Sequence, residues 1–196
     1  MGAESMRIPQ LVAHRGYAAC FPENTLLSMA KAVESGARFL ECDVQLCADG
    51  TPVLFHDASL ERTTGVQKNL LDCSYATVQS LDTCERSKFG ERFVGQGLTI
   101  PALADFITFL KSVPQVRTFI ELKNESLRRH GVDAVLDIVF PIIQPAFKQC
   151  ILIAYDAQVL RAARKRGVHQ CGWVLTTWDN ASHQEAKILA PDILIS

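Results

Sequence analysis

Apolar runs of strand length alternate along this chain with longer segments of helical periodicity. The apolar runs predict seven strands, at residues 11–13, 39–46, 53–55, 117–122, 150–154, 172–175 and 192–195. The intervening segments predict helices at residues 22–35, 101–111, 131–143, 157–166 and 181–189. Strands alternating with helices are typical of a parallel sheet whose strands are joined by crossover helices. We therefore predict an α/β fold.

Local signals mark the boundaries of several of these elements. Asn24 or Thr25 can supply the oxygen that caps the first helix, and Gly36 suits the position just after it. Residues 49–52, Asp-Gly-Thr-Pro, predict a turn between the second and third strands. Residues 65–97 are polar and irregular. A segment of that length in a compact domain usually has a functional role or forms a small subdomain.

Two carboxylates share one face of the second predicted strand. Alternate residues of a strand lie on opposite faces of its sheet. In residues 39–46 the even-numbered positions are all apolar, so Glu41 and Asp43 lie together on the other face. Two adjacent buried anions are costly unless a cation or basic groups compensate for them. Oxygen ligands suit Mg²⁺ or Ca²⁺ rather than zinc, and a solvated strand face is the alternative interpretation.

A third carboxylate lies on the fourth predicted strand. In residues 117–122 and just beyond, Phe119, Glu121 and Lys123 share one face, while Ile120 and Leu122 share the other. This arrangement repeats that of the second strand. It predicts a further acid on the same type of inward face, with a lysine beside it.

Each of two histidines directly follows a predicted strand. His14 is followed by Arg15, and His56 is followed by Asp57. Catalytic residues of (β/α) barrels come from the carboxyl ends of strands. Two imidazoles near a hard metal could divide the roles of general acid and base, and Arg15 and Lys123 could hold a phosphate. A single histidine here would more often be structural, but together with three carboxylates the pair favours catalysis.

Charge and hydropathy exclude some classes of function. The 196 residues include 20 Lys and Arg against 21 Asp and Glu, so no basic excess exists for nucleic-acid binding. The longest apolar stretches are far shorter than the roughly 20 residues of a membrane-spanning helix, so we predict no transmembrane segment. Residues 1–7 contain an early acid and no apolar core, which argues against a signal peptide.

The cysteines favour a reducing compartment. Seven cysteines are scattered along the chain without a CxxC pair, which argues against a zinc site built from thiolates. Several lie in apolar runs, where a reduced cysteine packs as a small hydrophobic residue. We therefore expect a cytoplasmic location.

Taken in order, these residues resemble the motifs of the glycerophosphodiester phosphodiesterases, which are barrel phosphodiesterases similar to phosphatidylinositol phospholipase C. The motifs are His14-Arg15-Gly16, Pro22-Glu23-Asn24-Thr25, Glu41-x-Asp43, His56-Asp57 and Glu121-x-Lys123. The spacings of 25 residues from Arg15 to Glu41 and of 12 from Asp43 to His56 also resemble that family. The match is strongest over residues 9–64, clear over 98–124 and looser over 151–180.

The resemblance implies a TIM-type (β/α) barrel that hydrolyses glycerophosphodiesters to glycerol 3-phosphate and an alcohol, using Mg²⁺ or Ca²⁺. It implies metal ligands Glu41, Asp43 and Glu121, an acid–base pair His14 and His56, and phosphate-binding residues Arg15 and Lys123. The insertion that in this family follows the second histidine would correspond to about residues 65–97.

We expect one domain over residues 1–196. Seven predicted strands are fewer than the eight of a barrel of about 250 residues, so the last strand and helix of the barrel should be missing. Lysophospholipase D activity on single-chain lipids and a non-catalytic phosphate- or polyol-binding barrel are the alternative functions. The sequence leaves open which histidine is the acid, the alcohol of the substrate, the native metal and the oligomeric state.

Overall fold

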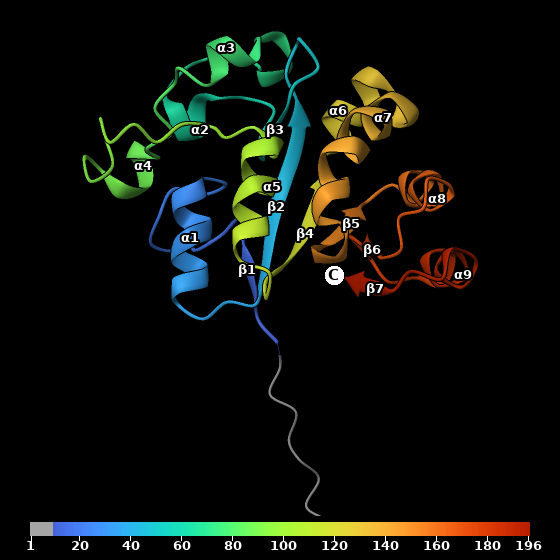
Figure 1. Ribbon diagram of the computed structural model, residues 1–196. Helices are drawn as coiled ribbons and strands as arrows, with labels where there is room; N and C mark the ends of the chain where they lie inside the picture. Colours follow the sequence, from blue (N-terminus) through green and yellow to red (C-terminus); the bar gives the residue numbers. More distant parts are fainter. Residues whose placement is uncertain (1–9) are drawn as a thin grey trace, which may run out of the picture.

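The computed structural model describes residues 10–196 of the chain, so the expectation about residues 1–7 lies outside the described residues. Within this range seven strands form one sheet, in the order β1-β2-β4-β5-β6-β7, with β3 added on β2 (Figure 1). The sheet is an open half-barrel, because β1 and β7 do not pair with each other. The strands are β1 (Val12–His14), β2 (Phe39–Leu46), β3 (Pro52–Leu54), β4 (Arg117–Leu122), β5 (Cys150–Ala154), β6 (Cys171–Val174) and β7 (Ile193–Ile195).

The third strand departs from the predicted parallel arrangement. All pairs along the main order are parallel, but β3 runs antiparallel to the end of β2, with Leu54 opposite Val44. The turn predicted at residues 49–52 makes this possible, because a short turn can join only antiparallel strands. The predicted parallel arrangement was therefore wrong for this strand.

Helices cover the outer, convex face of the sheet (Figure 1). The even-numbered side chains of β2 pack there, together with Leu103 and Phe106 of α5, Leu136 of α7 and Leu160 of α8. This is the main hydrophobic core, and it confirms the face predicted for β2. The longer helices are α1 (Leu26–Glu34), α5 (Leu103–Ser112), α7 (Val132–Ile143), α8 (Ala157–Lys165) and α9 (Asn180–Leu189), with α6 (Asn124–His130) and the 3₁₀ helix η2 (Gln144–Gln149) between them.

Residues 55–102, here called the β3–α5 segment, leave the sheet and return to it. The segment is less irregular than its composition predicts, because it contains four short helices: α2 (Glu61–Thr64), η1 (Leu70–Asp72), α3 (Tyr75–Val78) and α4 (Arg86–Phe89). Leu60, Leu70, Val78 and Ile100 form a separate small core with Val53 of β3. The segment therefore packs on the hairpin of β2 and β3.

The inner, concave face of the sheet has an apolar part. Phe119, Ile151, Ile153 and Val174 pack together on it. The charged residues of β2 and β4 lie on the same face, nearer the carboxyl ends of the strands.

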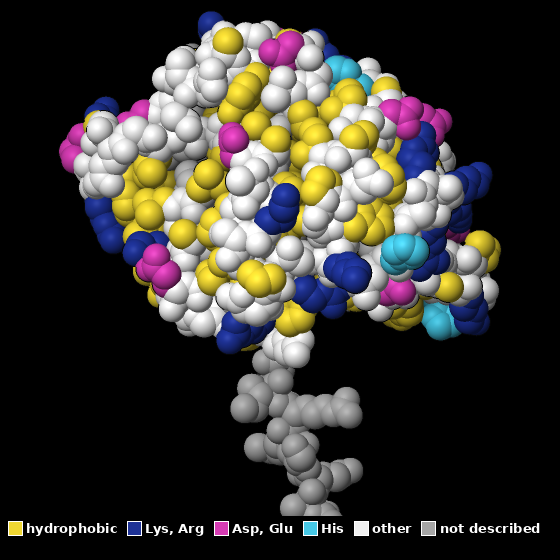
Figure 2. Space-filling view, viewed as in Figure 1, with side chains coloured by type: hydrophobic (Ala, Val, Ile, Leu, Met, Phe, Trp, Pro, Cys, Tyr) yellow, Lys and Arg dark blue, Asp and Glu magenta, His cyan; other side chains and the backbone are white. Residues whose placement is uncertain are grey.

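The face shown in Figure 2 carries charged side chains of both signs. On the face shown in Figure 2, acidic and basic side chains are interspersed rather than gathered into a basic stripe. Over residues 10–196 no single helix has the length and apolar character needed to cross a membrane. One pair, Asn124–His130 with Val132–Gln149, satisfies those criteria only when joined, and it is bent by 116°.

Candidate active site

Three buried carboxylates meet at the carboxyl ends of β2 and β4. Asp43 lies opposite Glu121 in the parallel pairing, and Glu41 is two residues earlier on the same face of β2. The exposed fractions of Glu41, Asp43 and Glu121 are 7%, 1% and 8%. One oxygen from each lies within 4.8 Å of one from each of the others. Their predicted convergence is therefore confirmed.

The donor set fits a hard divalent cation. All three side chains offer oxygen, the ligand that Mg²⁺ and Ca²⁺ prefer. Glu41 Oε1 is buried and has no hydrogen-bond partner. Burial and then the neighbouring Asp43 raise the pKa of Glu41 to about 8. A bound cation would remove both costs, because it would complete the coordination of the oxygen and offset the clustered negative charge.

Two basic side chains lie against the carboxylates. The backbone N–H of Arg15 donates to Glu41 Oε2 at 3.0 Å, and Arg15 Nε lies 3.1 Å from Asp43 Oδ2. Lys123 Nζ lies 2.9 Å from Glu121 Oε1 and 3.3 Å from Asp43 Oδ1. Burial lowers the pKa of Lys123, but the adjacent Asp43 and Glu121 outweigh burial and raise it overall. Both predicted phosphate-binding residues thus lie beside the predicted metal ligands.

The loop after β1 needs an unusual backbone to place Arg15. Arg15 and Asn24 both have left-handed backbone conformations, with φ of 56° and 53°. Gly16 has φ of 80°, and a Cβ there would come within 2.3 Å of Ser28 Oγ. Only glycine fits at this position, which explains why glycine follows Arg15. Strained non-glycine residues of this kind are concentrated at functional sites.

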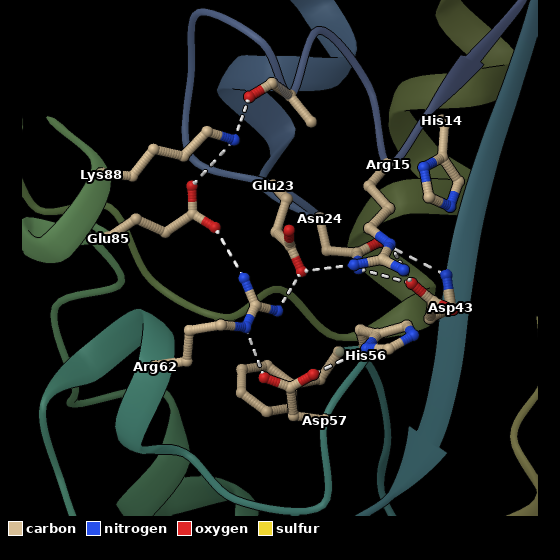
Figure 3. A network of polar contacts seen from close by, with 12 residues as sticks. His14, Arg15, Glu23, Asn24, Asp43, His56, Asp57, Arg62, Glu85 and Lys88 are labelled. Atoms are coloured by element: carbon tan, nitrogen blue, oxygen red, sulfur yellow. Dashed lines mark hydrogen bonds and ion pairs between the residues drawn. The ribbon is translucent and has the colours of Figure 1, made fainter.

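The two histidines reach the site from different elements. His14 ends β1, and its Nε2 lies 3.7 Å from Glu41 Oε2. Burial and the neighbouring Arg15 lower the pKa of His14. His56 follows β3, and its Nδ1 lies 2.6 Å from Asp57 Oδ1. In Figure 3 the two rings lie on either side of the Arg15–Asp43 pair.

His56 follows a strand, as predicted, but that strand, β3, is antiparallel to β2 and not one of the parallel strands. Instead the antiparallel β3 brings the chain back along β2, so that the N–H of Phe55 donates to the carbonyl of Asp43 at 2.9 Å. Buried Gln45 then holds this return, because its Nε2 donates to the carbonyls of residues 55, 56 and 57 at 3.1, 2.9 and 2.8 Å. The sequence analysis missed Gln45, although it shares the face of Glu41 and Asp43.

Helix capping explains only one residue of the motif at 22–25. Thr25 caps α1 through its hydroxyl oxygen, which accepts from the N–H of Ser28 at 3.1 Å. Asn24 instead faces Asp43, since its Nδ2 donates to Asp43 Oδ2 at 2.9 Å and its Oδ1 accepts from the Asp43 N–H at 3.3 Å. Glu23 accepts from Arg15 Nη1 at 3.1 Å. Asn24 and Glu23 therefore belong to the site.

Arg62 of α2 is a further residue that the sequence analysis missed. Its guanidinium contacts Asp57, Glu23 and Glu85, so it connects the surroundings of His56 with those of Arg15 (Figure 3). Desolvation raises the pKa of Asp57, but hydrogen bonds from Arg62 and His56 outweigh it, so the net shift is downward. Asp57 is thus held as a carboxylate against the His56 ring.

A cavity of about 690 Å³ along the edge of β1 does not contain the carboxylate cluster. His14, Gly16, Tyr17 and Phe39 are among its lining residues, and its walls are mostly apolar. Of the seven predicted site residues, only His14 is among those that line it. The carboxylates, and not this cavity, therefore define the candidate active site.

Comparisons with known proteins agree with this site. The family model described as the glycerophosphoryl diester phosphodiesterase family matches residues 14–164, a span that includes all the predicted site residues. A glycerophosphodiester phosphodiesterase from Caldanaerobacter subterraneus is 31% identical over 189 residues, covering 92% of this chain and 74% of the relative. One from Bacillus altitudinis is 33% identical over 124 residues, or 63% of this chain. The chain spans about half of that second relative, 49% of its length.

A solved structure shows a similar fold. It is an Oleispira antarctica phosphodiesterase in complex with the product sn-glycerol-3-phosphate. The two chains superpose with a TM-score of 0.81 and 26% identity, over 95% of this chain and 74% of the other.

Proposed function

The chain belongs to the glycerophosphoryl diester phosphodiesterase family, and we propose on that basis that it hydrolyses glycerophosphodiesters to glycerol 3-phosphate and an alcohol. The single observation that carries the proposal is the cluster of three buried carboxylates between two histidines. The similarity to a phosphodiesterase with bound glycerol 3-phosphate supports the choice of product.

We propose that Glu41, Asp43 and Glu121 hold one Mg²⁺ or Ca²⁺ ion. The unpartnered Glu41 Oε1 and the all-oxygen donor set support this assignment. When bound, the ion would offset the negative charge that develops on the non-bridging phosphoryl oxygens. Arg15 and Lys123 lie at the rim of the cluster and would bind the same phosphate, the arginine as a planar fork and the lysine as a point charge.

The two histidines would move the protons. In the reaction one P–O bond forms to the attacking oxygen and the P–O bond to the alcohol breaks. His14, whose pKa is lowered, would accept the proton of the attacking hydroxyl. His56, held through Nδ1 by Asp57, would deliver a proton from Nε2 to the leaving oxygen. Water and a hydroxyl of the substrate's glycerol are both possible attacking groups, and either route adds one water molecule overall.

The test is release of glycerol 3-phosphate from glycerophosphocholine by the purified protein. We expect EDTA to abolish the release and Mg²⁺ or Ca²⁺ to restore it. Glu41→Gln should remove the response to the metal, whereas Glu34→Gln, which changes an exposed acid of α1, should leave it intact. Activity that persists in EDTA, or in the Glu41→Gln protein, would contradict the assigned site. Faster turnover of lysophosphatidylcholine than of glycerophosphocholine would move the proposal to single-chain lipids.

A further inference from the structure

Arg62 donates to three carboxylates: Asp57 and Glu85 of its own β3–α5 segment and Glu23, which precedes α1. Its Nε donates to Asp57 Oδ2 at 2.6 Å, its Nη2 to Glu23 Oε1 at 2.5 Å, and its Nη1 to Glu85 Oε1 at 3.3 Å (Figure 3). Glu23 and Glu85 are 39 and 23 residues away from Arg62 along the chain. Five N–H donors in a rigid plane allow arginine, and not lysine, to make such a set of contacts.

Two of these carboxylates hold groups of the proposed mechanism. Asp57 contacts the His56 ring at Nδ1. Glu23 accepts from Arg15 through Oε1, the same oxygen that accepts from Arg62. The His56 ring, which would donate the proton, and the Arg15 guanidinium, which would bind the phosphate, are therefore both linked to Arg62. Arg62 with these carboxylates is called the anchor below. Asp57 makes no hydrogen bond or ion pair with Arg15, and Glu23 makes none with His56.

Glu85, the third carboxylate, connects Arg62 to the rest of the β3–α5 segment. Glu85 is 1% exposed, has a left-handed backbone with φ of 45°, and donates its N–H to the carbonyl of Thr63 at 3.0 Å. Nearby, Lys88 Nζ lies 3.9 Å from Glu85 Oε2 and donates to the carbonyl of Ala18 at 2.6 Å. The segment thus holds both Arg62 and the loop after β1.

We propose that Arg62 is a positioning residue that aligns His56, through Asp57, with Arg15, through Glu23, and that Glu85 holds Arg62 in place. The inference rests on the proposed function, because it assigns a catalytic meaning to the orientation of those two groups. Arg62 is 41% exposed and its ion pairs are partly solvated, so their value lies in geometry rather than in stability. Alignment of this kind is sensitive, since small misplacements of a catalytic group lower the rate strongly.

The most informative substitution is Arg62→Lys. It keeps the charge, but a single ammonium cannot reach all three carboxylates. Substitution of residues that orient metal-binding side chains typically lowers metal affinity or activity about 10–100-fold, and we expect a loss of similar size in kcat/KM. Freed movement of His56 should lower kcat, and freed movement of Arg15 should raise KM. Glu85→Gln should act in the same direction but less strongly, because Arg62 keeps its two other partners.

A matched control separates alignment from folding. Arg86→Lys changes an exposed arginine of the same segment, whose ion pair within residues 10–196 is with exposed Glu91. It should leave kcat, KM and the melting temperature unchanged. Arg62→Lys should leave the melting temperature nearly unchanged while lowering kcat/KM. The proposal would be overturned if Arg62→Lys lost all activity because it unfolds, while Glu85→Gln kept wild-type kinetics.

A double-mutant cycle tests the path through Asp57. If Arg62 orients His56 through Asp57, Arg62→Lys and Asp57→Asn remove the same constraint. The fold-loss of kcat in the double variant should then be smaller than the product of the two single fold-losses. Independent, multiplying losses would contradict that path.

A spectroscopic readout keeps this inference distinct from the proposed function. The ring proton of His56 that is hydrogen-bonded to Asp57 should give a downfield NMR signal without any substrate. Arg62→Lys should weaken or shift it, and Arg86→Lys should not. If the wild-type protein hydrolyses no glycerophosphodiester, the proposed function fails while this signal still reports on the anchor. An unchanged His56 signal and unchanged kinetics in Arg62→Lys would refute the anchor itself.

Discussion

The first half of the open sheet, with β2 and β4, and its second half, with β5 and β6, differ in the residues that they place at the same level of the inner face. The first half carries buried charge there, and the second half is apolar. Following the strand register across the inner face, Asp43 of β2 lies beside Glu121 of β4, which lies beside Ile153 of β5, which lies beside Gly172 of β6. At this level the first two strands carry carboxylates, and the next two carry Ile153 packed against Gly172. A Cβ on Gly172 would come within 2.9 Å of Ile153 Cγ2, so the glycine makes room for that side chain.

The difference shows that this fold confines its buried charge on the inner face to β2 and β4. Strands β5 and β6 meet the ordinary requirement of an α/β sheet, an apolar interior on both faces. Strands β2 and β4 do not, because Glu41, Asp43 and Glu121 are buried against each other. Such a cluster is stable only with compensating positive charge, which Arg15 and Lys123 supply in part. The first half should therefore determine activity, and the second half should determine stability.

The largest expected effect is on activity in the first half. His56→Ala should lower kcat by about 10²–10⁴-fold, the usual contribution of general acid–base catalysis, with little change in melting temperature. The matched change in the second half is Leu152→Ala, which removes a 1%-exposed side chain of β5 from the main core. It should cost about 2–5 kcal/mol of unfolding free energy and leave the kcat of the folded protein unchanged. Chemical denaturation and steady-state kinetics check the pair, and equal effects on both properties would remove the distinction between the halves.

Sequence periodicity predicted which side chains face the interior where the pattern was local. Alternation along residues 39–46 placed Glu41 and Asp43 on the inner face, and the same reasoning placed Glu121 and Lys123 beside them. The chemistry at these positions follows from strand geometry alone, because a period of two residues fixes which side chains share a face.

Contacts between distant segments could not be predicted in this way. Glu23 precedes a helix and has the composition of a capping motif, yet its partners are Arg15 and Arg62. Arg62 sits in a four-residue helix, where no periodic signal can form, and its partners Glu85 and Glu23 are 23 and 39 residues away along the chain. The antiparallel course of β3 was missed for a different reason. The alternation of strands and helices suggested a parallel sheet, although the short turn predicted at residues 49–52 joins only antiparallel strands.

A smaller effect is expected from pH acting on the carboxylate cluster. In the unfolded chain Glu41 ionises near its ordinary pKa of 4.5, whereas in the folded protein its pKa is raised to about 8. Between these values the folded state binds more protons than the unfolded state, so the free energy of unfolding should fall as pH rises from about 5 to 8. Arg15 and Lys123 limit the size of this loss by offsetting part of the negative charge.

Glu41→Gln should flatten this dependence in metal-free buffer. The variant should be more stable than the wild type at pH 8 and similar to it at pH 5, although it is expected to be inactive. Added Mg²⁺ or Ca²⁺ should stabilise the wild type at pH 8 and not the variant, since only a protein that binds the ion gains from it. Thermal melts at both pH values measure this, with Glu34→Gln as the exposed control. A variant as pH-sensitive as the wild type would show that Glu41 is not the titrating group.

The smallest expected effect compares helix caps in the two halves. Thr25 caps α1 beside the site, and Asp156 caps α8 after β5, where its Oδ1 accepts from the N–H of Gln158 at 2.8 Å. Removing either cap with alanine should cost about 1 kcal/mol of stability. Thr25→Ala should also reduce kcat several-fold, because the hydroxyl of Thr25 donates to the carbonyl of Pro22 at 2.6 Å and so supports the turn that carries Glu23 and Asn24. Asp156→Ala should leave kcat unchanged, because the buried residues Val159, Leu160 and Ala163 of α8 pack in the main core on the outer face. Thr25→Ser retains both hydrogen bonds and should restore activity as well as stability, whereas a kcat loss in Asp156→Ala matching that in Thr25→Ala would mean that the second half also shapes the site.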